Sequence, residues 1–301
     1  MNDELVKRIN ELKKKRNAII LVHNYQPAEV QDIADFAGDS LDLSRRAAET
    51  SADVIVFCGV HFMAETAAIL SPQKTVLLPA ADAGCPMADM ITVEKLRKLK
   101  NDNPGAPVVC YVNTSAAVKA ESDVCCTSAN AEKIVARMLE ERIIFIPDRN
   151  LGAYVASRTG KKLILSDGYC IVHDRMTKED VQAAKSSHPG AEFVAHPECR
   201  PEVTALADRV LSTSGMCAYA KSSGCKEMII GTETGILYRL KNENPEKRFY
   251  PLSARAVCLN MKKNSLEKVL WALEDMKNVV KVGKEVSLKA KKAIDCMLGN
   301  R

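Results

Sequence analysis

The sequence AIILVHNYQPAEVQDIADFAGDSLDLSRRAAETSADVIVFCG (residues 18–59) contains the pattern that best predicts the architecture of the chain. An apolar run ends in the polar pair His23 and Tyr25, which are two residues apart. A helix-like segment opening at Ser40 follows, and a second apolar run ends at Gly59. A strand, a helical segment and a second strand in this order are typical of a βαβ unit with parallel strands.

The same order of landmarks occurs three times along the chain. In each copy the hydroxyl residue comes 17 residues after the first member of the polar pair. A second apolar run ends 19 residues after the hydroxyl, and a cysteine follows 23 to 26 residues later. The corresponding residues are His23, Tyr25, Ser40 and Cys85; Tyr111, Asn113, Ser128 and Cys170; and His196, Glu198, Thr213 and Cys258. Internal repetition of this kind indicates repeated structural units.

The repeat predicts an α/β chain of three similar domains. Three apolar strand signals recur in each copy and alternate with helix-like segments, which favours parallel sheets covered by helices. We place the first repeat at residues 1–84, including an N-terminal helix, the second at 85–170 and the third at 171–258. The tail, residues 259–301, is predicted to be helical and to pack on the first repeat.

The repeated polar residues are candidates for a shared site. Active groups of parallel α/β sheets gather at the carboxyl ends of strands and at the helix N-termini that follow. Residues i and i+2 of a strand point to the same side, so both members of each pair can face one cavity. The pair His196 and Glu198 suits acid–base chemistry. The hydroxyl residues are predicted to be helix N-caps, and three converging helix N-termini would favour an anionic ligand.

The eleven cysteines do not indicate a disulfide framework, because their number is odd and no secretory signal precedes them. Cys58 and Cys110 lie inside apolar strands and are predicted to be buried. The three repeat cysteines leave two kinds of centre open. One is a zinc site completed by water or by a histidine such as His173, and the other is a [4Fe–4S] cluster with one open iron. Three unrelated buried thiols are the third possibility.

Composition excludes several classes of protein. The net charge of +5 is mild, and no basic stripe is interleaved with aromatic residues, so we expect no nucleic-acid partner. No apolar run is long enough to cross a membrane. The first 16 residues predict an amphipathic helix, since acidic residues stand among the lysines. We expect a cytoplasmic protein.

The chain resembles the quinolinate synthase family, the [4Fe–4S] enzymes of de novo NAD biosynthesis, through motifs spread over nearly its whole length. These motifs are HNYQ (23–26), QDIADFAGDSL (31–41), AETAAIL (64–70), CPMA (85–88), YVNTSA (111–116), TSANA (127–131), PDRNLG (147–152), GYCIVH (168–173), HPEC (196–199), STSGM (212–216) and NMKKNSL (260–266).

The resemblance implies three homologous α/β domains around a pseudo-threefold axis, with a [4Fe–4S] cluster at their junction held by Cys85, Cys170 and Cys258. It implies condensation of iminoaspartate with dihydroxyacetone phosphate to quinolinate, phosphate and water. The open iron would act as a Lewis acid. An L-aspartate oxidase or dehydrogenase would supply the first substrate. The residues implied to bind substrate are His23, Ser40, Tyr111, Asn113, Ser128, His173, His196, Glu198 and Thr213.

We assign proton transfer to Glu198 and His196, assisted by Tyr25, Tyr111 and His23. Two other readings stay open. One is a different three-cysteine [4Fe–4S] hydro-lyase that acts on a small hydroxy acid. The other is a non-catalytic iron–sulfur or zinc protein that senses redox state. Neither would need a site for a phosphorylated substrate.

Overall fold

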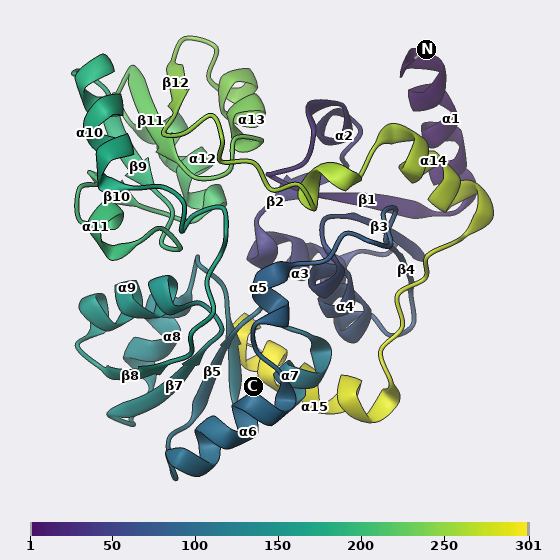
Figure 1. Ribbon diagram of the computed structural model, residues 1–301. Helices are drawn as coiled ribbons and strands as arrows, with labels where there is room; N and C mark the ends of the chain where they lie inside the picture. The colour runs from purple at the N-terminus through teal and green to yellow at the C-terminus, as the bar shows by residue number, and fades with distance from the viewer. Residues whose placement is uncertain (1, 300–301) are drawn as a thin grey trace.

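The structure is a computed structural model that describes residues 2–299, and it contains three α/β units arranged around a common centre (Figure 1). The first unit begins with the N-terminal helix and carries the first sheet. Its elements are α1 (Asn2–Lys15), β1 (Ala18–His23), α2 (Ala28–Asp32), β2 (Phe36–Gly38), α3 (Ser40–Glu49), β3 (Val54–Cys58), α4 (His61–Leu70) and β4 (Thr75–Leu77).

The second and third units repeat this order of elements. The second consists of α5 (Pro86–Asp89), α6 (Val93–Asp102), β5 (Val108–Tyr111), α7 (Ala116–Ala120), β6 (Val124–Cys126), α8 (Ala131–Arg137), β7 (Arg142–Ile146), α9 (Arg149–Thr159) and β8 (Lys162–Leu165). The third consists of α10 (Lys178–Ser187), β9 (Glu192–Ala195), α11 (Pro201–Thr204), β10 (Arg209–Val210), α12 (Thr213–Ser222), β11 (Glu227–Gly231), α13 (Ile236–Glu243) and β12 (Arg248–Pro251).

Each unit holds one four-stranded parallel sheet, and the three sheets share one topology. Their strand orders are β2-β1-β3-β4, β6-β5-β7-β8 and β10-β9-β11-β12. The central strands read as continuous apolar runs because helices cover both faces; all five residues of β3 are buried. The predicted α/β fold with three small parallel-sheet domains is therefore confirmed.

The prediction of three strands in each repeat was wrong, since every sheet has a fourth. The additional strands β2, β6 and β10 each form one edge of a sheet and have only three, three and two residues. Strand β4 is equally short, but its apolar run continues to Leu78, whereas the residues of β2, β6 and β10 are not part of a longer apolar run. All nine apolar runs recognised in the sequence are strands.

The units pack as one body. The largest cluster of buried apolar side chains includes Ile55 of the first unit, Phe145 of the second and Ile230 of the third. A continuous core of this kind fixes the relative positions of the three sheets, which is what a site built from all three requires.

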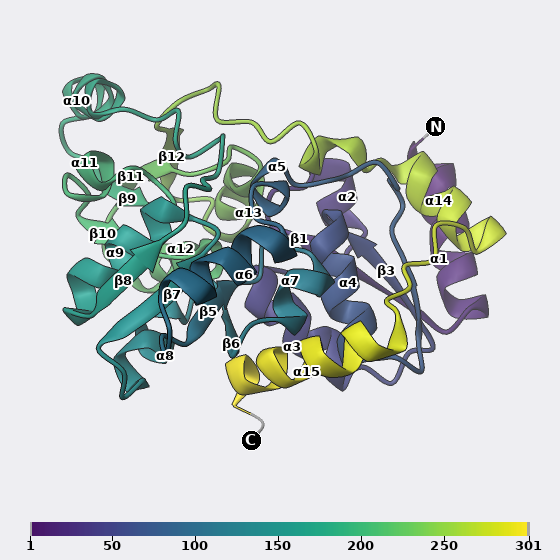
Figure 2. The same cartoon turned by 60° about the horizontal axis from the view of Figure 1, so that its bottom comes forward.

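The C-terminal tail divides between two units, although we expected all of it on the first. After a short 3₁₀ helix (Met261–Lys263), α14 (Leu266–Asp275) packs on α1 and β3. The last helix, α15 (Lys284–Leu298), packs mainly on α7 and β6 of the second unit and also contacts α4 (Figure 2). The tail therefore ties the first two units together. None of the helices within residues 2–299 has the length and apolar character to span a membrane.

Candidate functional site

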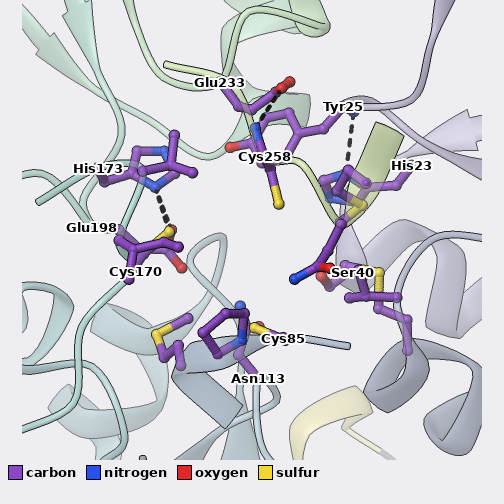
Figure 3. A pocket seen from close by; sticks show the side chains of 18 of the residues that line it. His23, Tyr25, Ser40, Cys85, Asn113, Cys170, His173, Glu198, Glu233 and Cys258 are labelled. Atoms are coloured by element: carbon purple, nitrogen blue, oxygen red, sulfur yellow. Dashed lines mark hydrogen bonds and ion pairs between the residues drawn. The ribbon is translucent and has the colours of Figure 1, made fainter. Parts of the chain in front are cut away.

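A cavity of about 460 Å³ lies where the three units meet, at the carboxyl ends of their central strands (Figure 3). His23 and Tyr111 are the last residues of β1 and β5, and His196 directly follows β9. The structure brings all thirteen site residues predicted from the sequence to the wall of this one cavity. They are His23, Tyr25, Ser40, Cys85, Tyr111, Asn113, Ser128, Cys170, His173, His196, Glu198, Thr213 and Cys258.

Two histidines occupy equivalent places and have equivalent hydrogen bonds. His23 Nδ1 accepts from the backbone N–H of Tyr25 at 3.2 Å, and His196 Nδ1 accepts from the backbone N–H of Glu198 at 3.3 Å. Burial lowers the pKa of each imidazole to about 3. Both rings are therefore neutral, with the proton on Nε2, and each offers one N–H donor from a fixed position.

Glu198 connects groups from two units. Its Oε1 accepts from the Tyr111 hydroxyl at 2.6 Å, and its Oε2 lies 2.7 Å from His173 Nδ1. Burial alone would raise the pKa of Glu198, but His173, His196 and the Tyr111 hydroxyl outweigh it and lower the pKa to about 2. Burial and the nearby Glu198 charge raise the pKa of Tyr111, so the phenol keeps its proton. The site thus holds an ionised carboxylate in a buried place.

A chain of hydrogen bonds runs from Glu198 to the first unit. His173 Nε2 lies 2.8 Å from the Thr232 hydroxyl, which lies 2.6 Å from the Tyr25 hydroxyl. Together with the His173–Glu198 and Glu198–Tyr111 contacts, this joins five side chains in one line. Such a line can move a proton from one side of the cavity to the other.

The three repeat cysteines reach the cavity from three sides (Figure 3). Burial raises the pKa of Cys85 to about 12 and also raises the pKa of Cys170 and Cys258. Thiols in such surroundings become thiolates when a metal replaces the proton. All eleven cysteines are free, and none of the other eight, which all belong to the described part of the chain, lines this cavity.

This donor set suits a metal centre. Three thiols are soft ligands of the kind that hold zinc and iron–sulfur clusters. Cys170, His173 and Glu198 also have ligand atoms within 4.8 Å of one another, and His173 Nδ1 lies 3.2 Å from Cys170 Sγ. Both kinds of centre predicted from the sequence therefore find suitable residues here.

The predicted capping role of the hydroxyl residues was wrong. The N-cap of α3 is Asp39, whose carboxylate accepts from two backbone N–H groups, and the N-cap of α12 is Ser212. Ser40 and Thr213 are the first helical residues instead. Because the Asp39 carboxylate already occupies the N-terminus of α3, that terminus is not free for another anion. Ser128 lies two residues before the N-cap of α8, Asn130.

The amide of Asn113 offers an unused acceptor. Its Oδ1 is buried and has no hydrogen-bond partner among residues 2–299. A buried polar atom without a partner costs stability, so its presence in a cavity indicates a ligand group that pairs with it. The complementary group is an N–H or O–H.

Sequence reasoning did not name several polar residues in and around the cavity, among them Arg175, which lines it. Thr232 completes the hydrogen-bond chain, and Asp148 and Glu233 accept from the backbone N–H groups of Cys170 and Cys258. Lys262 forms an ion pair with Glu233 at 3.0 Å. Asp148 and Glu233 each come one residue after the end of a second apolar run, so the repeat itself contained a signal for them. Lys262 lies outside the repeats, and its segment was marked only by the motif NMKKNSL (260–266) of the family resemblance.

Comparison with known proteins agrees with this geometry. Residues 7–299 match the family model described as quinolinate synthetase A protein. The chain is 60% identical over 299 residues to a quinolinate synthase of Geobacter sp. (strain M21), which covers 99% of this chain and 98% of that protein. It is 58% identical over 291 residues to a quinolinate synthase of Dehalococcoides mccartyi (97% and 96%) and over 295 residues to quinolinate synthase 1 of Methanosarcina acetivorans (98% and 97%). The chain therefore belongs to the quinolinate synthetase A family.

Proposed function

We propose that the protein is a cytoplasmic quinolinate synthase of the transferase class. It would condense iminoaspartate with dihydroxyacetone phosphate to give quinolinate, phosphate and two waters. The observation that carries the proposal is the convergence of thirteen side chains, three of them thiols, in one cavity of about 460 Å³. That volume suits small metabolites. An aspartate-oxidising enzyme, an L-aspartate oxidase or dehydrogenase, would supply the imine.

Cys85, Cys170 and Cys258 would hold a [4Fe–4S] cluster, since they are the thiols that line the cavity, and each follows the last strand of one of the three sheets. When bound, a cluster with three thiolate ligands supplies a Lewis acid at its fourth iron. The other cavity residues would then bind the substrates and move protons.

The donors of the cavity match a dicarboxylate. The Nε2–H groups of His23 and His196 and the hydroxyls of Ser40, Ser128 and Thr213 would bind the carboxylates. Asn113 Oδ1, which lacks a partner, would accept from the substrate nitrogen. Arg175 also lines the cavity, and a guanidinium is well suited to a phosphate.

Glu198 would take protons from carbon and nitrogen during the imine–enamine shifts that condensation and ring closure require. Its carboxylate is ionised, so it can accept a proton, and it lines the cavity where the substrates would bind. Tyr111 and His173 hold it in place, and the line through Thr232 to Tyr25 can return the proton elsewhere in the cavity. His196, neutral beside it, would donate rather than accept.

Anaerobic reconstitution of the wild type and of Cys85→Ala tests the proposal. We expect about four irons per chain and quinolinate formation from the two substrates in the wild type. The variant should lose both, because two thiolates do not hold the cluster. The matched control is Cys296→Ala, a half-buried cysteine of α15 outside the cavity, which should keep both.

The outcomes separate the alternatives. Full cluster content and normal turnover in Cys85→Ala would refute the assignment. A wild-type cluster without quinolinate formation would favour a hydro-lyase of a small hydroxy acid. A colourless protein with one zinc would favour a sensor, with Cys170, His173 and Glu198 as ready ligands.

A further inference from the structure

Two of the three cysteine loops are held by a buried carboxylate. Asp148 Oδ2 accepts from the backbone N–H of Cys170 at 3.1 Å, and Glu233 Oε1 accepts from the backbone N–H of Cys258 at 3.0 Å. Both acids are fully buried. Their second oxygens are also occupied, since Asp148 Oδ1 accepts from Leu151 N–H at 2.8 Å and Glu233 Oε2 from Gly235 N–H at 2.7 Å. Each carboxylate therefore bridges a strand end to a cysteine.

All three repeats share one backbone hydrogen bond near the cysteine, and two of them add a bond to a carboxyl group. In every repeat a backbone N–H just beyond the second strand donates to the carbonyl two residues before the cysteine. These bonds are His61 to Ala83 at 2.8 Å, Arg149 to Gly168 at 2.8 Å and Thr234 to Ala256 at 2.9 Å. The residue preceding each donor is Val60, Asp148 and Glu233 in turn. A side chain that bonds to the cysteine amide is thus present in the second and third repeats, whereas the first has an apolar valine.

Glu233 has a further partner that reaches the first unit. Lys262 Nζ lies 3.0 Å from Glu233 Oε1 and donates to the Tyr25 carbonyl at 2.5 Å. A Cβ added at Gly235 would stand 2.7 Å from the backbone carbonyl oxygen of Tyr25, so glycine is needed for this close approach. Through Glu233 and Lys262, the Cys258 loop is therefore connected to the backbone of Tyr25 in the first unit.

Burying a carboxyl group costs free energy unless its oxygens are hydrogen-bonded. In the first repeat Val60 stands at the corresponding position, and the shared backbone bond from His61 to Ala83 forms there without a carboxyl group. The benefit that offsets the cost must come from the bond to the cysteine amide, which fixes the direction of the Cα–Cβ bond and hence of the sulfur.

We propose that Asp148 and Glu233 are positioning residues that direct Cys170 and Cys258 toward the metal centre through their backbone amides, leaving Cys85 as the least constrained of the three ligands. The inference rests on the proposed function only in taking the three thiols as ligands of one centre. It concerns how firmly that centre is held, and it does not depend on which substrates are converted.

The test compares Asp148→Asn and Glu233→Gln with Asp123→Asn and Asp208→Asn in the reconstituted protein. The two controls also lose a carboxylate that accepts a backbone N–H, at 2.7 Å in each case, but at the opposite end of the same sheets. An amide presents one oxygen where two backbone N–H groups need two acceptors. The readout is the rate at which iron is lost to a chelator, with folding followed by circular dichroism.

We expect iron loss on the order of 10- to 100-fold faster in Asp148→Asn and Glu233→Gln, the range typical of groups that orient metal ligands. Both controls should lose iron at the wild-type rate. Glu233→Asp, which keeps the charge but is one methylene shorter, should also lose iron faster, because position rather than charge is required.

Iron retention equal to that of the controls in folded Asp148→Asn and Glu233→Gln would overturn the inference. So would failure of both to fold while both controls fold, since the acids would then serve the fold and not the centre. A wild type that holds iron but makes no quinolinate would refute the proposed function alone. The comparison of iron-loss rates would still decide whether Asp148 and Glu233 position the cysteines.

Discussion

The amino ends of the three sheets carry the same residue type in the same geometry, whereas the carboxyl ends carry different residue types. At the amino ends, one aspartate in each unit accepts from the N–H of the residue 15 positions earlier: Asp35 from Ile20 at 2.8 Å, Asp123 from Val108 at 2.7 Å and Asp208 from Phe193 at 2.7 Å. The N–H of each aspartate also donates to the carbonyl of the same partner, at 2.8 to 3.1 Å. The three units are alike here in residue type and in geometry.

At the carboxyl ends the same three strands present different chemistry. The first supplies a neutral imidazole and a phenol, the second a phenol and an amide, and the third a neutral imidazole and an ionised carboxylate. The strand-pairing requirement is the same in every unit, so the amino ends have stayed alike. A single asymmetric ligand in a shared cavity needs a different group from each side, so the carboxyl ends have diverged.

The largest effect should come from Glu198→Gln, which neutralises the ionised carboxylate beyond the carboxyl end of β9. We expect kcat to fall on the order of 10²- to 10⁴-fold, the usual contribution of a general base, with cluster content unchanged. Steady-state kinetics and iron analysis measure the two quantities.

The matched control for this variant is Glu192→Gln, at the amino end of the same strand, where Glu192 accepts from the Tyr219 hydroxyl at 2.5 Å. It should leave kcat within about twofold, because a lost surface hydrogen bond acts on stability and not on the cavity. Equal losses of kcat in the two variants would contradict the division between the two ends of β9.

The contrast between the two ends also explains what the sequence could reveal. Repetition is visible wherever the units perform the same task, so the nine recognised strands and the three cysteines could be placed from spacing. Strands β2, β6 and β10 were missed because their two or three residues are not part of a longer apolar run, and their pairing depends on tertiary structure. Twelve of the thirteen cavity residues are landmarks of the repeat, which recur in position even though their residue types differ, and His173 was found from its place three residues after Cys170.

Contacts between the units could not be predicted from the sequence. The side chain of Thr232 meets Tyr25 only after the first and third units have packed together, and Lys262 comes from the tail. The capping error has a local cause: Asp39 and Ser212 stand directly before the residues that we named, and either neighbour can serve as an N-cap. Only the backbone conformation distinguishes them.

A smaller effect should come from the aspartates of the amino ends. Asp123→Ala should lower the free energy of unfolding by about 0.5–1.5 kcal/mol, the net value of one hydrogen bond. Asp35→Ala and Asp208→Ala should lower it by at least as much, because each also removes an ion pair, with Lys13 at 2.6 Å and with Lys185 at 3.5 Å. The sites lie in different units, so the losses should add in the triple variant. Urea denaturation measures them. Asp102→Ala, which removes an exposed ion pair with Lys98, is the control and should change stability by less.

Quinolinate formation per folded molecule should be unchanged in these aspartate variants. A loss of stability in only one of the three single variants, or a fall in turnover, would show that the amino ends are not equivalent. Either result would weaken the view that they serve only the fold.

An effect of similar size concerns pH and the two neutral histidines of the carboxyl ends. Because burial lowers the pKa of His23 and His196 to about 3, each binds a proton in the unfolded chain below about pH 6.5 but not in the folded one. Stability is therefore complete above pH 6.5 and decreases as the pH falls from there toward 3. When the pH falls from 7.5 to 5.5, each histidine should lower the free energy of unfolding by about 1.4 kcal/mol.

The variant His23→Asn should remove the contribution of His23 to this acid-induced loss of stability. The measurement is urea denaturation of the cluster-free protein at both pH values. Between pH 7.5 and 8.5 the variant and the wild type should change in parallel, since the imidazole is neutral in both states there. An unchanged acid dependence in His23→Asn would mean that the buried imidazole gains a proton on the folded side as well. In that case the strand-end histidines would carry charge into the cavity, and the first unit would differ from the third by less than the neutral rings imply.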